Sequence, residues 1–399
     1  MKKTLLRFIA AALAAAVFVS CNKESTDPGP SRRVVLMYAA AYNNLAAEIS
    51  EDIGELCGGN LPSVGSGDIL LVYSHLPARS YDFKTPTNPV LFRAYRDSKG
   101  HNRRDTLVTY PDTDVSSSPE VLRKVLCQVQ EMFPSEHYGL LVSSHGKGWI
   151  PAGYTENTSS IFSLSERREY PPTRELGIEN VENSGIDIVD LPDAIPMKLD
   201  FLITDACLMG CVEVAYEIKD KCRLFLASPT EVLSDGLIYK TMAPLLTNTA
   251  IPDLEEICRQ YMAHYEAFSG DYQSASITLV DCERLDGLAR ACRDIIESRR
   301  DVLAAMDRNV VQKYFYNSFH WFYDLRDMLA RTEPSSEQLR ALDAALADCI
   351  LYFGATDKFF HLELRNVCGL SMYYPIPEST ELNDFYKKLA WNKATGLIQ

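Results

Sequence analysis

The sequence predicts an α/β protein whose mostly parallel central sheet is covered by helices on both faces. Short unbroken apolar runs, the pattern of strands buried on both sides, alternate with amphipathic helical segments through the first half of the chain. Because neighbouring parallel strands need a crossover, which is usually a helix, this alternation places helices against the sheet. The composition, with 46% hydrophobic and 24% charged residues among 399, is that of a globular protein and excludes a disordered or fibrous chain.

Five apolar runs are expected to form the buried strands, with helical periodicity between them. In the helix predicted over 118–133, Ser118 supplies an N-cap and Pro119 occupies the first helical position. Two β-prone and more polar segments, 90–95 and 106–110, predict a hairpin at an edge of the sheet. The buried strands are predicted over residues 34–38, 69–73, 138–144, 199–204 and 224–228, and the other helices over residues 42–57, 191–195 and 208–219.

The second half of the chain is mainly helical. Two strand-like runs in it, 276–280 and 369–374, are expected to return to the main sheet. We therefore predict one domain over residues 33–250 and a helical C-terminal region over residues 251–399 that contributes strands to the same sheet. The helices of this region are predicted over residues 252–268, 285–306 and 336–353.

The N-terminus resembles an export signal rather than part of the fold. Three basic residues precede an apolar run over 8–19 that is too short for a comfortable membrane span. A small residue then precedes Cys21, as in the cleavage box of bacterial lipoproteins. We expect residues 1–21 to be a signal peptide ending at a lipidated Cys21, and residues 22–32 to be a polar tether. The protein would then be an exported lipoprotein of a bacterial cell envelope, at the outer membrane or the cell surface. A plain secretory signal with an incidental cysteine is the alternative.

Charge and cysteine content exclude further classes of function. Asp and Glu total 54 against 40 Lys and Arg, and the formal charge of −14 is unsuited to binding nucleic acid or an anionic membrane. The cysteines that follow Cys21 are scattered and include no CxxC pair, so most are expected to be buried as small hydrophobic side chains. Cys207 and Cys211 lie four residues apart, but no further ligand follows at zinc spacing. A redox or metal protein is therefore disfavoured.

Two short motifs, His145-Gly146 and Asp205-Ala206-Cys207, each follow a predicted buried strand. The carboxyl ends of parallel strands meet at one edge of a sheet, so both motifs are expected there. A catalytic thiol needs a proton acceptor and donors for an oxyanion. His145 supplies the first, and the backbone N–H groups of Gly146 and Cys207 supply the second. A helix that begins at Cys207 would favour the thiolate. A lone histidine or cysteine is more often structural, but together the two motifs predict a Cys–His dyad.

Three segments carry a resemblance to a known family. They are VVLMYAAAYNNLAAEISEDI near the start, HYGLLVSSHGKGW around His145 and MKLDFLITDACLMGCVEVAYEIKD around Cys207. These segments resemble, in the right order, the clostripain family of cysteine peptidases, which shares the caspase-like fold with gingipains and legumains. The resemblance implies a caspase-like three-layer αβα sandwich, with a mostly parallel central sheet, in which His145 and Cys207 form the catalytic dyad. Lys147 stands where the family often has glycine.

The resemblance also implies a specificity pocket for Arg or Lys. In the family, an acidic residue two positions before the cysteine lines this pocket, and Asp205 stands there. Asp235 resembles a second pocket acid. Two carboxylates in a partly buried pocket need a cation, and a guanidinium can bind them bidentately. The expected substrates are proteins or peptides with Arg or Lys before the cut. The alternatives are an N-cap role for Asp205 and a turn role for Asp235.

A long segment, 151–186, lies between the two motifs and lacks any periodicity. The resemblance implies activation by cleavage between the histidine and cysteine segments. Arg167, Arg168 and Arg174 lie in this polar, exposed-looking loop, and each would suit an Arg-accepting pocket. We expect autocleavage at one of them. The alternative is an ordinary surface loop with incidental basic residues.

No cofactor is expected to be required. Some family members depend on calcium, and four acidic residues of the loop region could supply ligands, so calcium stays open although no EF-hand spacing and no defined metal site is present. We expect a monomer. The competing function is a catalytically inactive cell-envelope lipoprotein that uses the fold as a binding module, and the joint presence of both motifs favours the enzyme. The four acidic residues are Glu156, Glu179, Glu182 and Asp187.

Overall fold

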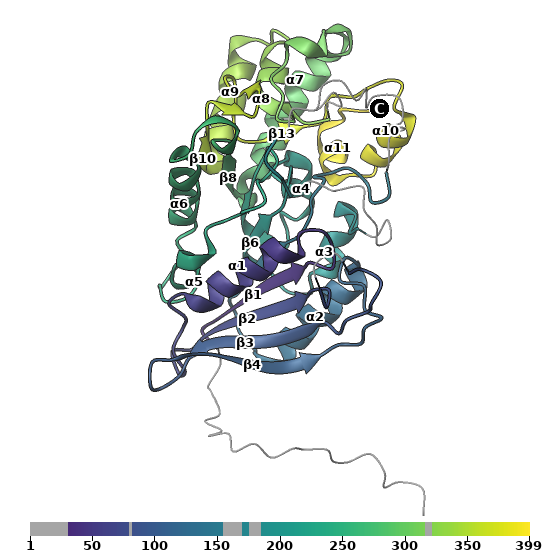
Figure 1. Cartoon of the computed structure of the whole chain (residues 1–399). Helices are drawn as coiled ribbons and strands as arrows, with labels where there is room; N and C mark the ends of the chain where they lie inside the picture. Colours follow the sequence, from purple (N-terminus) through teal and green to yellow (C-terminus); the bar gives the residue numbers. More distant parts are fainter. Residues whose placement is uncertain (1–30, 80–81, 155–169, 175–184, 316–320) are drawn as a thin grey trace, which may run out of the picture.

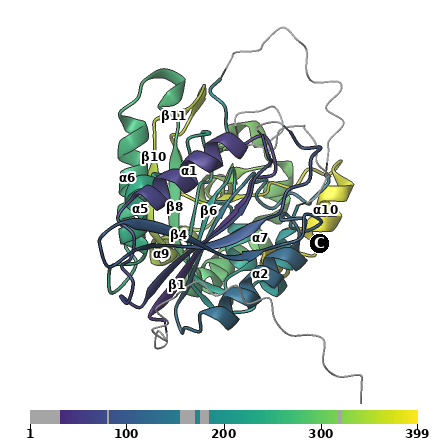
Figure 2. The same ribbon diagram turned by 60° about the horizontal axis from the view of Figure 1, so that its bottom comes forward.

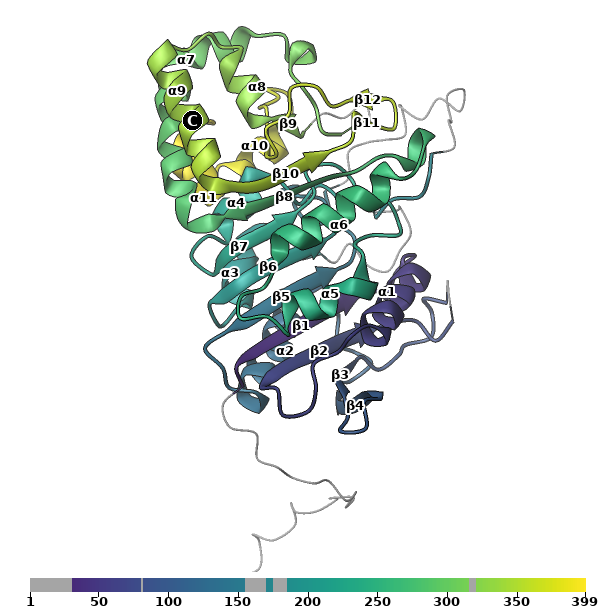
Figure 3. The same cartoon turned by 90° about the vertical axis from the view of Figure 1, so that its left-hand side faces the viewer.

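The protein is described here from a computed structural model, in which residues 31–79, 82–154, 170–174, 185–315 and 321–399 are described. A nine-stranded sheet in the order β10-β8-β7-β6-β5-β1-β2-β3-β4 forms its centre. Helices pack on both faces of this sheet, as Figures 1 and 3 show. The predicted three-layer α/β architecture is therefore confirmed.

The five predicted apolar runs form the parallel centre of the sheet. Within this group of five, adjacent strands pair in parallel, and their residues are almost all buried because helices cover both faces. The strands are β1 (Arg33–Ala40), β2 (Asp68–His75), β5 (Tyr138–Ser143), β6 (Leu199–Asp205) and β7 (Cys222–Ala227).

Antiparallel strands complete both edges of the sheet. On one side, β3 (Val90–Arg96) and β4 (Asn102–Thr109) form the predicted hairpin. On the other, β8 (Ser276–Asp281) and β10 (Ile350–Ala355) continue the sheet beyond β7. The C-terminal region thus contributes two strands to the main sheet.

The helices divide between the two faces, which Figure 2 separates most clearly. In α2, Ser118 accepts a hydrogen bond from the backbone N–H of Val121, the cap that the sequence predicts. One face carries α1 (Ala46–Gly58), α5 (Tyr239–Leu246) and α6 (Leu254–Glu266). The other carries α2 (Pro119–Met132), α3 (Leu191–Ala194), α4 (Val212–Glu217) and α7 (Leu285–Ala305), and beyond the sheet lie α8 (Leu325–Ala330), α9 (Ser336–Cys349), α10 (Thr380–Tyr386) and α11 (Ala390–Thr395).

Two predicted elements of the C-terminal region differ in the structure. The helix predicted over 336–353 ends at Cys349, and β10 begins at the next residue because the run Ile-Leu-Tyr-Phe favours an extended chain beside β8. The run 369–374 does not return to the main sheet. Its strand β13 (Ser371–Met372) pairs with β9 (Tyr323–Asp324), since β10 already occupies the place beyond β8.

The cysteines behave as the sequence predicts. Eight of the ten described cysteines are buried and all ten are free thiols, with Cys127 exposed and Cys368 half-buried. Across the described ranges, no helix is long and apolar enough to cross a membrane. The predicted signal peptide, the lipidation site Cys21 and most of the tether lie outside the described residues, so they stay predictions.

Candidate active site

The two predicted motifs meet at the carboxyl edge of the sheet. Strands β5 and β6 are parallel neighbours, with Ser143 opposite Asp205 at their ends, so the chain leaves both strands at the same edge. A Cβ added to Gly146 would lie 2.5 Å from the carbonyl oxygen of Cys207 and 3.1 Å from its backbone nitrogen. Only a glycine therefore allows the segment that carries His145 to approach the backbone of Cys207 this closely.

The ring of His145 is held on both nitrogens. Its Nδ1 lies 3.0 Å from the carbonyl oxygen of Arg174, and its Nε2 lies 2.6 Å from Oδ1 of Asn44. A carbonyl oxygen can only accept, so Nδ1 donates its proton to Arg174. Nε2 donates to Asn44 when the ring is an imidazolium, or accepts from the amide nitrogen of Asn44 when that amide is turned over. Either arrangement fixes the ring plane.

Sequence reasoning missed Asn44. It follows β1, the strand that lies beside β5 in the sheet, so it emerges at the same edge as His145. The rule that gathers reactive groups at the carboxyl ends of parallel strands applies to it as well. Its place near the start of the predicted helix over 42–57 offers no signal of its own, since asparagine is common there as a cap.

Cys207 is fully buried, and its surroundings differ from the prediction. The expected helix does not begin there: α4 starts at Val212, and Leu208 adopts a left-handed backbone with φ of 62°. The chain turns because the backbone N–H of Leu208 donates to Thr230. The thiol sulfur instead contacts the backbone of Val232, whose N–H donates to it at 3.2 Å and whose carbonyl oxygen lies 3.6 Å away.

Arg174 fills a pocket beside this pair. Its guanidinium is fully buried, with Nη1 2.8 Å from Oδ2 of Asp205 and Nη2 2.6 Å from Oδ2 of Asp52. Nη1 also donates to Oγ of Ser143 at 2.8 Å. The prediction of an exposed Arg174 is therefore wrong: two carboxylates offset the cost of burying its charge. The candidates Arg167 and Arg168 lie outside the described residues.

Asp52 is the pocket residue that sequence reasoning did not find. It lies on the inward face of α1 together with Ile49 and Ile53, at helical spacing. An acid on an otherwise apolar helix face was the available signal. Asp235, the expected second pocket acid, has an exposed side chain that accepts from Oγ of Ser234 at 3.4 Å.

The charged side chains of the pocket act on one another. Burial raises the pKa of Asp52 to about 8, Arg174 opposes this rise, and the neighbouring carboxylate of Asp205 adds to it. Burial lowers the pKa of Arg174, but Asp205 and Asp52 together outweigh it, so the pKa is raised. Asp205 also accepts a hydrogen bond from the hydroxyl of Tyr239 at 2.7 Å. The pocket is therefore organised around a cation.

The residues just before Arg174 pair with segment 232–234. The N–H of Arg174 donates to Val232 at 2.7 Å, and the N–H of Ser234 donates to Pro172 at 2.9 Å. Thr173 and Leu233 form an antiparallel bridge. This backbone pairing is the way in which many proteins bind an extended peptide at an exposed edge.

Comparison with known proteins decides the family. The sequence model of the Clostripain family, peptidase family C11, matches residues 37–394. The chain belongs to this family. Clostripain of Hathewaya histolytica is 26% identical over 211 residues, which span 49% of this chain and only 37% of that relative.

Solved structures of the clostripain family support the fold. An inactive zymogen C11 protease from Parabacteroides distasonis matches with a TM-score of 0.76 and 26% identity, over 92% of this chain and 99% of that one. A secreted C11 cysteine protease from Bacteroides thetaiotaomicron, iotapain, matches with a TM-score of 0.74 and 22% identity, over 92% and 100%. These findings support a cysteine-type peptidase with the caspase-like fold.

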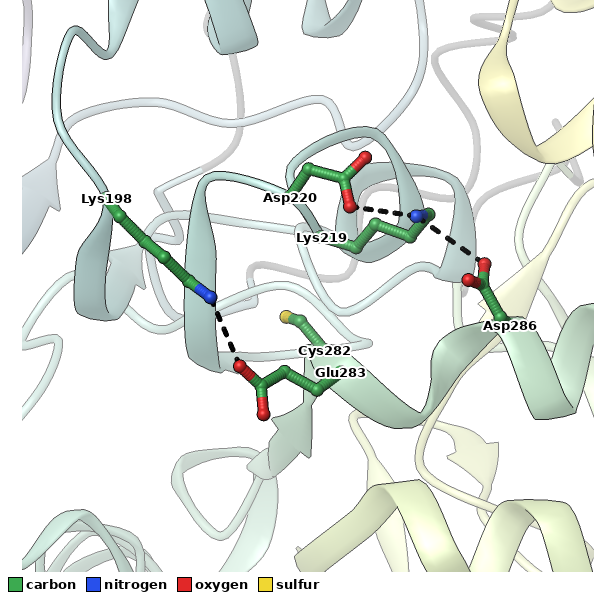
Figure 4. Close-up of a pocket in the computed structure, with 6 residues that line it drawn as sticks. All are labelled: Lys198, Lys219, Asp220, Cys282, Glu283 and Asp286. Atoms are coloured by element: carbon green, nitrogen blue, oxygen red, sulfur yellow. Dashed lines mark hydrogen bonds and ion pairs between the residues drawn. The ribbon is translucent and has the colours of Figure 1, made fainter.

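A surface hollow on this clostripain-family chain offers no competing site. It lies at the amino end of β6, opposite the edge that carries Cys207, and its charges pair with one another (Figure 4). Lys198 contacts Glu283 at 3.2 Å, and Lys219 contacts Asp286 at 3.5 Å. The side chains of Lys198, Glu283 and Asp286 are largely exposed, so water solvates them, whereas Lys219 and Cys282, which also line the hollow, are mostly buried.

The described residues contain little of the acidic set that was considered as a calcium site. Glu156, Glu179 and Glu182 lie outside them, and Asp187 uses Oδ1 to accept from the N–H of Ala152 at 2.5 Å. Within the described ranges, no group of three or more His, Cys, Asp or Glu side chains is arranged to hold a metal ion.

Proposed function

We propose that this protein is a cysteine endopeptidase that cleaves peptide bonds after Arg or Lys, with Cys207 as nucleophile and His145 as general base and acid. One observation carries the proposal. Arg174 places its guanidinium between Asp205 and Asp52 while its carbonyl oxygen lies 3.0 Å from His145. A basic residue in this position has its carbonyl oxygen within hydrogen-bond reach of His145, one of the two residues proposed to cleave the following bond.

The chemistry follows from this placement. The Cys207 sulfur attacks the carbonyl carbon of the basic residue, and the oxygen takes the negative charge beside the backbone N–H groups of Gly146 and Cys207. His145 carries the thiol proton to the departing amine as the C–N bond breaks. A water molecule then hydrolyses the thioester, with His145 accepting its proton, and the thiol is restored.

Arg174 itself is the first substrate in this proposal. The bond after Arg174 is the autocleavage site, and the uncut chain is a zymogen because its own segment fills the pocket. The extended pairing of 172–174 with 232–234 supports this, since it holds the segment as a bound peptide would be held. Cutting frees the segment to leave, and other proteins with Arg or Lys before the cut then enter.

Intact mass and N-terminal sequencing of four purified chains test this proposal. The wild type is expected to yield two fragments cut after Arg174, and Cys207→Ala to remain one chain. Arg174→Ala is expected to lose this cut, while the matched control Arg167→Ala/Arg168→Ala keeps it. A wild type that stays whole and turns over neither arginyl nor lysyl peptides would contradict the peptidase and support the inactive binding lipoprotein.

We also propose that the protein is a lipoprotein of a bacterial cell envelope, anchored through Cys21. The basic start, the apolar run over 8–19 and the small residue before Cys21 support this. Metabolic labelling with a tagged fatty acid tests it. Label should enter the wild type and be lost in Cys21→Ser, and label that remains in Cys21→Ser would contradict the anchor.

A further inference from the structure

Two acids hold the guanidinium of Arg174 from different elements of the fold. Asp205 ends β6 and contacts Nη1, whereas Asp52 comes from the middle of α1 and contacts Nη2. Each acid therefore takes its own nitrogen, and the two nitrogens of the planar fork lie at fixed separation.

We propose that Asp52 is the specificity-determining residue that makes this pocket prefer arginine over lysine, an inference that rests on the proposed peptidase function. A lysine brings a single nitrogen, a compact point charge without the fork. When that nitrogen binds one acid, the other loses its direct partner. A buried polar group left without a partner penalises the wrong ligand more than a lost favourable contact would.

The two acids differ in the hydrogen bonds that remain when no arginine is bound. Asp205 still accepts a hydrogen bond from the hydroxyl of Tyr239, whatever fills the pocket. The hydrogen bond described for Asp52 is the one from Arg174, and its neighbours on the helix face are apolar. Asp52 therefore depends on the second nitrogen of the guanidinium, so Asp52 is the acid that distinguishes arginine from lysine.

The sharpest test compares two peptides that differ only in Arg or Lys before the cut. On processed wild type, kcat/KM is expected to favour the arginyl peptide by about tenfold or more, the effect of one hydrogen bond to a charged group. Asp52→Ala is expected to bring the ratio close to one. Asp52→Asn, which keeps an oxygen acceptor, should lie between them. The matched control is Glu51→Ala, an exposed acid on the same helix, which should keep the wild-type ratio.

A second measurement needs no processed enzyme. The self-cleavage rate of Arg174→Lys should be at least about tenfold below that of the wild type, and this difference should shrink in an Asp52→Asn background. A wild type that prefers lysine, or an unchanged ratio in active Asp52 variants, would overturn the role of Asp52 while leaving the peptidase intact. A wild type that cleaves neither peptide would instead overturn the peptidase.

A different observation, at Tyr170, carries a second inference. The ring of Tyr170 stacks on Phe360 with centroids 4.4 Å apart and planes 10° apart. Its hydroxyl lies 2.6 Å from Nδ1 of His361. Phe360 has a positive φ of 52°, a strained conformation that turns the chain between β11 (Lys358–Phe359) and β12 (Leu362–Glu363).

We infer that Phe360 and His361 form a subsite for an aromatic residue four positions before the cleaved arginine in protein substrates. Tyr170 precedes Arg174 by four residues, and residues 172–174 pair with segment 232–234. A substrate peptide that paired with segment 232–234 in the same way would place its side chain at this position against the ring of Phe360. The inference rests on the proposed peptidase, in which the segment before Arg174 is a bound substrate.

Peptides with Tyr, Phe or Ala at this position test the subsite. Stacking is expected to raise kcat/KM about two- to tenfold for Tyr and Phe over Ala in the wild type. Phe360→Ala should remove this preference, so that the three peptides are cleaved with similar kcat/KM. Ile251→Ala, at a highly exposed apolar position, is the control that keeps the preference. A preference that persists in Phe360→Ala would overturn the subsite, whereas cleavage of none of the peptides would overturn the peptidase.

Discussion

Two ends of the same sheet carry the same kinds of charged side chains in opposite surroundings. At the carboxyl end of β6, Arg174 and Asp205 are both fully buried and lie 2.8 Å apart. At the amino end, Lys198 and Glu283 lie 3.2 Å apart with side chains that are 62% and 52% exposed. Water solvates the second pair and is excluded from the first.

The difference shows which charged side chains are held at defined positions by the fold. An exposed ion pair contributes roughly 0–1 kcal/mol, so its position carries little information. A buried pair costs desolvation energy and survives only with good geometry, and removing one partner is strongly destabilising. The two buried acids therefore need an arginine between them, and this need is the physical basis of the proposed specificity.

The largest expected effect comes from a substitution that fills the pocket around the guanidinium of Arg174. A Cβ at Gly236 would overlap Nη2 of Arg174 and lie 2.6 Å from Oδ2 of Asp205. Gly236→Ala is expected to lower kcat/KM for arginyl peptides by roughly a hundredfold or more, since the guanidinium would lose its place between charged partners. Steady-state kinetics on arginyl peptides measures this loss.

The control for this prediction is Gly270→Ala. Gly270 has the same φ of 65°, but nothing lies within 4 Å of an added Cβ. It should show the backbone strain, about 1 kcal/mol of stability, without the loss of activity. Equal activity in the two variants would mean that the pocket tolerates the extra carbon and that the contrast between the two ends is overstated.

The next effect concerns the orientation of His145 at the buried end. Asn44→Ala removes the oxygen that lies 2.6 Å from Nε2. We expect kcat to fall roughly ten- to a hundredfold, a part of what general acid–base catalysis supplies, while KM changes little. Asn43→Ala is the matched control, because the hydrogen bonds of its side chain within the described residues go to the backbone of residues 40 and 45. A fall in KM alone, or equal effects of both variants, would exclude an orienting role.

A smaller effect is the pH dependence of the uncut chain. Burial raises the pKa of Asp52 from 3.8 to about 8, with Arg174 lowering it and Asp205 and Glu55 raising it further. A carboxyl whose pKa rises on folding stabilises the fold fully below its unfolded pKa, and this contribution is lost as pH rises through the folded pKa.

Thermal unfolding of two uncut chains measures it. The stability of Cys207→Ala relative to Cys207→Ala/Asp52→Asn should decrease as pH rises from about 4 to about 8. A difference that stays constant over this range would show that Asp52 titrates normally, and would remove the distinction between buried and exposed acids on which the comparison rests.

The sequence predicted the parts of the site that follow from local pattern. Apolar runs identified β5 and β6, and their ends placed His145 and Cys207 at one edge of the sheet. The resemblance named Asp205, which contacts Arg174, but it named Asp235 rather than Asp52 as the second acid. Asp52 contacts a residue 122 positions away, through the packing of α1 against the sheet. That choice depends on tertiary structure, which residue spacing does not encode.

The smallest expected effect concerns the exposed ion pair at the amino end of β6. Lys198→Ala and Glu283→Ala, singly or together, should change unfolding free energy by no more than about 0.5 kcal/mol, because water replaces each lost partner. Peptidase activity should stay at the wild-type level, since the pair lies at the opposite end of β6 from Cys207. Denaturant unfolding and kcat/KM on an arginyl peptide measure both quantities. A loss of activity here would mean that the amino end of the sheet is coupled to the pocket, and burial alone would then not locate the functional charges.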